Sequence, residues 1–536
     1  PSSTKAVETP GTAPMPADTP TELPPPPPAV VPRNEWDGIA VPELGEWRPK
    51  RRVTVVIPHY EAQNELDLTL AALSRQTYPR ELMEIVVVDD GSSVAPEIPD
   101  HASNLDVSVH VQEDRGFGLA RARNLGARVA RGEILVFIDC DMMPEAQHIE
   151  AHARWHHVVS DALVFGFRWH ADFSEADAGT LADAVAAGDL RSILPGQDPQ
   201  RPAWIEGHLE RTDMLTGPFD DQFLVTSGGN LSLRRDHYLS IGGTDESFDR
   251  WGGEDNEFGF RAVQAGLIVI PERNAVCWHQ GEGHEPSAEE LESHRLQQPK
   301  MRNLIAELGY RNPVPGCTYT VPYAVATIDA GNTPAEATSR TVESILGSRF
   351  HDLIVVVYTP DDDTDAAWLR RRFEPDTRVH VVDDPLDLDE THPFSPLRLS
   401  VPARTLFHEN TMTEIADQVR ASGVGVLHGT LPDTAPGSAM LRVVSTRALN
   451  RARRIAKSAD EIDPVISTLF GERWASGRTL GLGRIHSSFE ITEPRDPYSD
   501  RAEDEAAEAA AAALYAIESQ LSDLQTRRAL RLADAA

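Results

Sequence analysis

Two aspartates, Asp139 and Asp141, stand directly after the apolar run ILVFI, which has the composition of a buried strand. Alternate residues of an extended chain point to the same side, so both carboxylates face one side of the turn and Cys140 points away. Paired carboxylates suit Mn²⁺ or Mg²⁺ bound to a diphosphate. A solvated acidic turn would explain the pair equally well, so the neighbouring motifs must decide.

A second acidic cluster follows a tryptophan and two glycine pairs in GGNLSLRRDHYLSIGGTDESFDRWGGEDNEFGFR. Gly228 and Gly229 allow a backbone to approach a ligand closely. The start of a helix would explain Glu254 and Asp255 through the helix dipole. A helix start does not explain Trp251 and the glycines next to these two acids. Their presence favours a surface that binds a ligand.

His279 ends the strand-like run LIVIPERNAVCWH and is a candidate third metal ligand. A lone histidine in such a place is more often structural. His284, in HQGEGH, could also reach the metal, but a surface-loop position explains it better.

The strand-like runs RRVTVVIPHY, MEIVVVDDGSS and GEILVFIDCDMMP alternate with helical stretches over residues 65–76 and in GLARARNLGARVA. Alternation of this kind predicts an α/β fold with a parallel sheet, in which ligands gather beyond the carboxyl ends of the strands. Each of the three runs ends in polar or turn residues, which places the candidate residues at that edge.

Six motifs follow one another between residues 50 and 290: VVIPHYE, VVVDDGS, ARNLGARVARGEILVFIDCD, GGNLSLRR, FDRWGGEDNEFGFR and CWHQ. In this order they resemble family 2 glycosyltransferases with a galactosyltransferase-type carboxyl half, a group that includes bacterial chondroitin polymerases and β-1,4-galactosyltransferases. The resemblance implies a GT-A fold, Rossmann-like with a mostly parallel central sheet. It also implies metal-dependent transfer from a UDP-sugar donor to an acceptor hydroxyl of a glycan or glycoconjugate.

The resemblance assigns roles to individual positions. It implies nucleotide contacts at Pro58, Tyr60, Glu61, Asp90, Arg121 and Asp139; metal ligands at Asp139, Asp141 and His279; and a donor and acceptor wall at Gly228, Gly229, Trp251, Gly252, Gly253 and Glu254. The metal, Mn²⁺ or Mg²⁺, would neutralise the departing diphosphate.

Asp255 is the general base that the resemblance favours. It would take the acceptor proton while that oxygen attacks the anomeric carbon, with inversion of configuration. Related retaining GalNAc transferases typically carry Asn directly after WGGE, so the acid here favours inversion. Glu254 is the second candidate base, although a role in binding the acceptor suits it better.

An internal repeat begins near Tyr319. From there the predicted strand, turn, helix, strand and acidic turn of the first unit recur in the same order. VLHGTLPD stands where the first copy has IDCD, and His486 stands where it has His279. We therefore expect a second, degenerate GT-A-like α/β domain over residues 317–490 that is catalytically inactive.

These boundaries leave a Pro-rich, disordered tail over residues 1–47, a catalytic domain over 48–310 and a carboxyl-terminal helical segment over 491–536. Leu514, Ile517, Leu521 and Leu524 recur at three-four spacing in that segment. A helix docked on the domain explains the spacing, and pairing into a homo-oligomer remains an alternative.

Composition narrows the function classes. A net charge of −34 argues against nucleic acid as a partner. Cys140, Cys277 and Cys317 form no CxxC pair, which argues against a disulfide framework and favours a reducing compartment. No apolar run reaches the length that spans a bilayer. We expect a soluble cytoplasmic protein, at most peripheral at the cytoplasmic face of the membrane.

Two other functions compete with transfer. A catalytically silent nucleotide-sugar-binding scaffold would use the Pro-rich arm and the terminal helix for assembly, but it leaves the acid, metal and histidine set unexplained. A sugar-1-phosphate nucleotidyltransferase shares the sheet and the acids. Such enzymes carry a Gly-rich, basic first loop, whereas IPHYEAQNE stands at that position.

Overall fold

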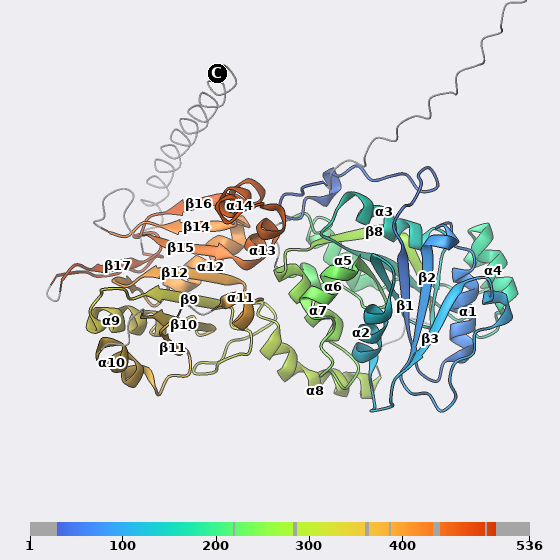
Figure 1. Ribbon diagram of the computed structural model, residues 1–536, viewed down its shortest axis with the longest axis horizontal. Coiled ribbons are helices and arrows are strands. Elements are labelled where there is room, and N and C mark those ends of the chain that lie inside the picture. The colour runs from blue at the N-terminus through green and yellow to red at the C-terminus, as the bar shows by residue number, and fades with distance from the viewer. Residues whose placement is uncertain are drawn as a thin grey trace, which may run out of the picture.

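The computed structural model describes residues 29–217, 220–281, 287–359, 364–384, 387–432, 440–487 and 490–499. Two α/β units lie side by side along the long axis of the molecule (Figure 1). One is built on an eight-stranded sheet, the other on a seven-stranded sheet with a small three-stranded sheet beside it. The expected α/β class, with a second α/β domain, is confirmed. Residues 500–536 of the predicted carboxyl-terminal helical segment and His284 lie outside the described residues, whereas residues 491–499 contain a short strand, Ile491–Thr492, instead of a helix.

The first sheet has the strand order β3-β2-β1-β4-β7-β6-β8-β5. Strands β1 to β4 are mutually parallel, β7 is antiparallel to both of its neighbours, and β6 is parallel to β8. The bounds are β1 Val53–His59, β2 Met83–Asp89, β3 Asp106–Val111, β4 Ile134–Ile138, β5 Met142–Pro144, β6 Ala162–Ala171, β7 Asn230–Arg234 and β8 Ile268–Gln280.

Alternating apolar side chains of this sheet bury both of its faces. Val53, Val55 and Ile57 pack with α1 and α3 in one core, whereas Val56 packs with α2, α6 and α7 in another. Burial on both faces explains the continuous apolar runs in the sequence. The helices of this unit are α1 Gln63–Leu73, α2 Leu119–Val129, α3 His148–Val158, α4 Ala178–Ala187, α5 Ala203–Arg211, α6 Arg235–Ile241, α7 Glu254–Gln264 and α8 Ala288–Leu304.

The segment 29–47, which we expected to belong to a disordered tail, packs on the first unit. Asn34 is buried, and its amide donates to the carbonyls of Leu215 (3.0 Å) and Val269 (2.8 Å). The Trp47 indole donates to Glu150 at 2.8 Å. Residues 1–28 of the expected tail lie outside the described part of the chain. The predicted boundary at residue 47 is therefore wrong, because residues 29–47 belong to the folded unit.

The second sheet has the strand order β11-β10-β9-β12-β15-β14-β16, and β13-β17-β18 form the small sheet. The strands are β9 Ala324–Asp329, β10 Leu353–Tyr358, β11 Val379–Val382, β12 Leu397–Pro402, β13 Thr405–Phe407, β14 Val426–Gly429, β15 Leu441–Ser445, β16 Glu472–Ala475, β17 Leu482–Ile485 and β18 Ile491–Thr492. The helices are α9 Ala335–Leu346, α10 Thr364–Phe373, α11 Leu388–Thr391, α12 Thr411–Ser422, α13 Thr446–Ile455 and α14 Ile462–Phe470.

Seven strands of the two sheets correspond in order and in direction. In the first sheet Val53 of β1 pairs with Ile134 of β4, and in the second Ala324 of β9 pairs with Leu397 of β12. The internal repeat read from the sequence is therefore present in the topology. The predicted counterpart of IDCD is wrong, because VLHGTLPD begins with β14, which occupies the place of β6 rather than that of β4.

Counting along the paired strands places Pro402 and Arg404 at the positions of Asp139 and Asp141. A backbone hydrogen bond supports this register: Gln280 N donates to Asp141 O, and Ile485 N donates to Arg404 O, both at 2.9 Å.

The same register gives a new counterpart for His279. Met142 of β5 pairs with His279, and Thr405 of β13 pairs with Arg484. The counterpart of His279 is thus Arg484 and not His486, which lies two residues further on. The second unit carries two arginines where the first carries an aspartate and a histidine.

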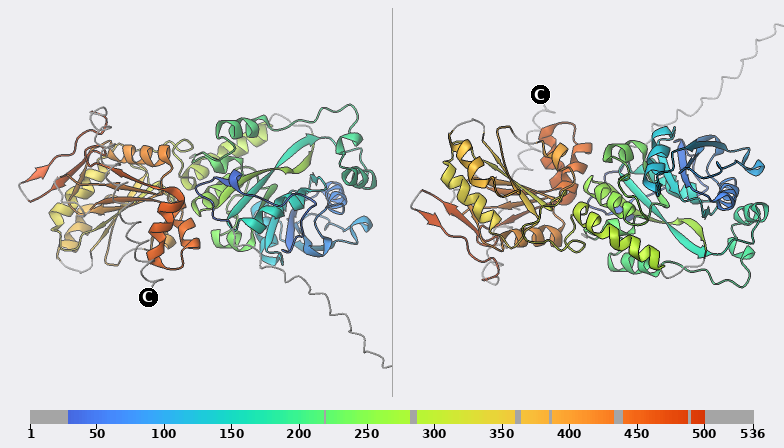
Figure 2. Two further views of the ribbon diagram at one scale, coloured as in Figure 1. Left: turned by 90° about the horizontal axis from the view of Figure 1, so that it is seen from above. Right: turned by 90° about the horizontal axis from the view of Figure 1, so that it is seen from below.

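A fully buried arginine of α13 joins the two units. The Arg451 guanidinium donates to the carbonyls of Gly266 (2.7 Å) and Leu267 (3.2 Å), and to those of Val31 (3.2 Å) and Arg33. Figure 2 shows α13 at the junction of the units in both of its views. Because a buried charge requires its partners, this contact fixes the units relative to each other.

Among the described helices, none combines the length and the apolar composition that crossing a bilayer requires.

Candidate functional site

Asp141 and His279 meet at one edge of the first sheet. Asp141 lies between β4 and β5, and β5 pairs with β8 so that Met142 stands opposite His279. The distance from His279 Nε2 to Asp141 Oδ2 is 3.5 Å. Burial and the nearby Asp139 raise the pKa of Asp141, whereas His279 opposes that shift. Two predicted ligands from distant parts of the sequence, Asp141 and His279, are therefore neighbours.

Asp139, the third predicted ligand, faces a buried arginine. Arg123 of α2 donates to Asp139 Oδ1 at 3.0 Å. Gly229 lies against the same carboxylate, and a Cβ at that position would come within 2.1 Å of Asp139 Oδ2. Gly228 lies against Arg123 in the same way, at 2.4 Å. A side chain at either glycine would therefore displace Arg123 or Asp139 from its present position.

The donor set is suited to a divalent cation, although it is not a closed cage. Within the described ranges, no three His, Cys, Asp or Glu side chains already converge as metal ligands. Asp141 and His279 form the near pair, and the Asp139 carboxylate is engaged by Arg123. Carboxylate oxygens with one imidazole fit Mn²⁺ or Mg²⁺ coordination. A cation here would offset the repulsion that Asp139 exerts on Asp141.

The predicted nucleotide contacts lie at the carboxyl ends of β1 and β2. Pro58 pairs with Val88, the residue before Asp89, and Asp90 follows β2 directly. Tyr60 is 53% exposed, and Glu61 adopts a left-handed conformation with φ 50°.

Asp90 and Arg121 face each other beside these residues. Arg121 Nη2 lies 3.4 Å from Asp90 Oδ1, which also accepts from Gln112 Nε2 at 2.6 Å. Burial raises the pKa of Asp90 against these partners. The predicted nucleotide residues therefore share one edge of the sheet.

The predicted donor and acceptor wall is the turn that begins α7. Gly252 (φ 99°) and Gly253 (φ 97°) adopt a left-handed conformation that disfavours other residues, and Trp251 is 49% exposed. Glu254 and Asp255 follow in the first helical turn. Backbone geometry therefore accounts for the two glycines, and the amino-terminal turn of a helix suits the two acids.

Glu254 and Asp255 have unusual electrostatics. Burial and the neighbouring Asp255 raise the pKa of Glu254 to about 7, and Arg123 opposes this shift. The Oε2 atom of Glu254 is buried and has no partner among the described groups. Burial also raises the pKa of Asp255, against the opposing effects of Arg123 and Arg168. Two adjacent carboxyl groups with displaced pKa values are typical of a functional site.

Arg123 is the residue that the sequence reasoning missed. It is buried and holds Asp139 and Glu254 together, with Nη1 lying 3.2 Å from Glu254 Oε1. Its carboxylate neighbours raise the pKa of the guanidinium in spite of its burial. A signal was available, because Arg123 stands between Ala120 and Ala127 on the apolar face of α2, where an unpaired charge would be costly.

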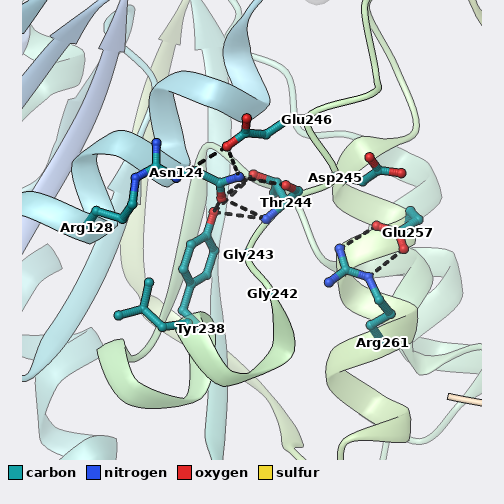
Figure 3. A pocket seen from close by; sticks show the side chains of 11 residues that line it. Asn124, Arg128, Tyr238, Gly242, Gly243, Thr244, Asp245, Glu246, Glu257 and Arg261 are labelled. Carbon is teal, nitrogen blue, oxygen red and sulfur yellow. Dashed lines mark hydrogen bonds and ion pairs between the residues drawn. The ribbon is translucent and has the colours of Figure 1, made fainter. Parts of the chain in front are cut away.

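The residue next to Arg123 anchors the loop that leads to Trp251. Asn124 donates to Thr244 O (2.8 Å) and accepts from Thr244 N (3.0 Å) and the Tyr238 hydroxyl (2.7 Å). Figure 3 shows these side chains converging at a cavity of about 440 Å³ bordered by α2, α6 and α7. Helix α2 thus positions the acidic turn through Arg123 and the glycine-rich loop through Asn124.

Comparison with known proteins agrees with this arrangement. Residues 54–182 match the family model "Glycosyl transferase family 2", and residues 222–273 match "N-terminal domain of galactosyltransferase". The two matches together contain the acidic turn, the glycine pair, the turn before α7 and the first part of β8.

Three curated relatives are similar to parts of this chain. Chondroitin synthase of Escherichia coli is 30% identical over 53% of this chain and 42% of its own length. Chondroitin synthase of Pasteurella multocida is 27% identical over 62% of this chain and 36% of its own length. Validoxylamine A glucosyltransferase of Streptomyces hygroscopicus is 31% identical over 42% of this chain and 50% of its own length. The chain thus spans at most half the length of these relatives.

Proposed function

Because residues 54–182 match the family 2 glycosyltransferase model and residues 222–273 match a galactosyltransferase model, we propose that the protein transfers a sugar from a nucleotide diphosphate donor to an acceptor hydroxyl. The observation that carries the proposal is the approach of Asp141 to His279, with Arg123 linking Asp139 to the turn that holds Asp255. Residues from four separate segments gather at the edge of the sheet where ligands of such folds bind.

The donor is proposed to be a UDP-sugar. Asp90 is suited to accept a hydrogen bond from the uracil imide N–H, and Pro58, Tyr60 and Glu61 would line the uridine. Arg121 lies beside Asp90 and would face the nucleotide or its phosphates. Asp139, Asp141 and His279 would hold Mn²⁺ or Mg²⁺, which would supply a Lewis acid for the diphosphate leaving group.

Asp255 is the proposed general base. Its carboxylate takes the proton of the acceptor hydroxyl as that oxygen bonds to the anomeric carbon, while the bond from that carbon to the diphosphate oxygen breaks. Attack opposite the leaving group inverts the configuration. Arg123 and Arg168 favour the ionised carboxylate that this step requires, because both oppose the rise in the pKa of Asp255.

The second unit, residues 317–490, is proposed to be catalytically silent. Pro402, Arg404 and Arg484 stand where the first unit has Asp139, Asp141 and His279, and guanidinium groups do not bind a divalent cation. The first unit, residues 48–310, would then supply all of the chemistry.

A screen of UDP-sugars for Mn²⁺-dependent hydrolysis tests the proposal. We expect the wild-type protein to hydrolyse at least one donor slowly without acceptor, and Asp255→Asn to lose that activity while retaining UDP binding. If UDP binds tightly but the wild-type protein turns over no donor, the protein is a nucleotide-sugar-binding scaffold instead.

A further inference from the structure

A cleft of about 610 Å³ lies between the two units. Its walls come from the loop before η5 (Gln222–Val225), from the segment after α8 and from α12 of the second unit. The lining residues are Arg211, Asp220, Asp221, Leu224, Glu307, Gly309, Tyr310, Asp417, Arg420 and Ala421. Ligand pockets occur preferentially at such domain interfaces. The cleft lies beside the turn that holds Asp255, the proposed base.

Two contact paths link the cleft to the turn that holds Asp255. Leu224 O accepts from the side chain of Asn256, the residue after Asp255, at 3.4 Å. On the other side, the Tyr310 hydroxyl lies 3.6 Å from Met301 Sδ. A Cβ on Gly253 would come within 2.5 Å of that same sulfur atom, so Met301 packs directly against the glycine turn.

The electrostatics of Tyr310 agree with this placement. Burial raises the pKa of Tyr310 to about 12, and the charge of Asp255 contributes to the shift. The ring also packs edge-on against Phe223, with centroids 6.1 Å apart. One side of the cleft is thus an aromatic side chain within electrostatic reach of the proposed base.

Arg420 of α12 closes the cleft from the second unit. Its Nε lies 3.1 Å from Asp220 Oδ2, and its Nη2 lies 3.6 Å from Glu307 Oε1. Glu307 in turn accepts from the backbone of Tyr310 at 2.6 Å. Together with the buried Arg451 contact, these ion pairs hold the two walls at a fixed spacing, so the cleft is preformed.

The charges in the cleft indicate which ligand it suits. Its lining contains four carboxylates and two guanidiniums, and both guanidiniums are already paired: Arg211 with Asp221 at 2.5 Å and Arg420 with Asp220. A uronate or a phosphate would add negative charge here without a new counter-ion. Carboxylates and a tyrosine side chain instead suit sugar hydroxyls, which donate hydrogen bonds.

We propose that this cleft binds a neutral oligosaccharide acceptor and delivers its terminal hydroxyl to Asp255. The inference rests on the proposed transferase function. It gives the silent second unit a role, because α12 supplies one wall of the acceptor site. The same chain would then use one unit for chemistry and both units for recognition.

The test separates transfer from donor hydrolysis. Ala421 is exposed on the cleft side of α12 in the second unit, so Ala421→Trp places a large side chain in the cleft. The probes are cellobiose, lactose and N,N′-diacetylchitobiose, with the UDP-sugar that the wild-type protein hydrolyses as donor. We expect Ala421→Trp to lower the ratio of transfer to hydrolysis by at least about tenfold. Ala186→Trp, on the exposed side of α4, is the matched control and should leave both rates unchanged.

Three outcomes are distinguishable. An unchanged ratio of transfer to hydrolysis in Ala421→Trp would place the acceptor elsewhere and overturn the inference. Transfer to glucuronate-terminated oligosaccharides but to none of the neutral probes would overturn the assigned ligand class. If the wild-type protein hydrolyses no nucleotide sugar at all, the proposed function itself fails.

Discussion

The two sheets of this molecule share an order of strands and differ where the first one gathers its proposed site residues. Both keep buried apolar strands, such as Val53–His59 and Ala324–Asp329, because these residues build the core. At the metal turn the first unit has Asp139 and Asp141, whereas the second has Pro402 and Arg404. The second unit thus keeps the fold without the residues proposed to bind the metal, since a few residues at strand ends form the proposed site and many buried residues determine the fold.

The largest expected effect comes from the proposed base. Asp255→Asn should lower the rate of transfer about 100- to 10,000-fold, because the neutral amide cannot take the acceptor proton. Asp463→Asn, in the first turn of the counterpart helix α14, should leave transfer unchanged. Steady-state kinetics on both variants checks the contrast. If Asp255→Asn stays active while Glu254→Gln is inactive, Glu254 is the base.

The metal turn should be nearly as sensitive. We expect Asp141→Ala to lower Mn²⁺-dependent turnover about 100- to 1,000-fold, since the departing diphosphate loses its charge stabilisation. Arg404→Ala, at the corresponding position of the second unit, should turn over donor at the wild-type rate. Measuring both rates across a Mn²⁺ titration checks the comparison. Equal losses in both variants would show that the second unit takes part in the chemistry.

The junction of the units should affect stability. Arg451→Met leaves several buried carbonyl groups without a donor, so it should lower the free energy of unfolding by about 3 kcal/mol. The exposed Arg478→Met serves as the control. Urea denaturation followed by tryptophan fluorescence measures both variants. An Arg451→Met protein with wild-type stability would contradict a tightly fixed junction.

The smallest expected effect is on the pH profile. Asp255 must be ionised to act as a base, and burial raises its pKa, so activity should fall as the pH drops through that raised value. Arg168 favours the ionised form. Arg168→Gln should therefore raise the pKa further and move the acid limb of kcat/KM to higher pH by a small step. A shift to lower pH would contradict this assignment of the base.

Much of the first unit could be predicted from the sequence, because its motifs stand at the ends of strongly apolar strands. The pairing of Asp141 with His279 follows from two such strand ends. Arg123 was missed, although its place between Ala120 and Ala127 indicates that it faces inward. Its partners, Asp139 and Glu254, could not be predicted, because only the packing of α2 brings them together.

The second unit was read correctly as a repeat but aligned wrongly at one strand. Chain order does not reveal that β12 lies beside β9 while β14 lies beyond the antiparallel β15. Once the pairing is known, Arg404 and Arg484 become the counterparts of the metal ligands. These two arginines support the expected inactivity of the second unit better than the original alignment with VLHGTLPD and His486 did.

Isothermal titration calorimetry with UDP, with and without Mn²⁺, tests the central claim most directly. We predict one UDP per chain in the presence of Mn²⁺, with this binding lost in Asp141→Ala and kept in Arg404→Ala. Two equivalents of UDP per chain, or Mn²⁺-dependent binding that survives in Asp141→Ala, would contradict a single nucleotide site built on the first sheet.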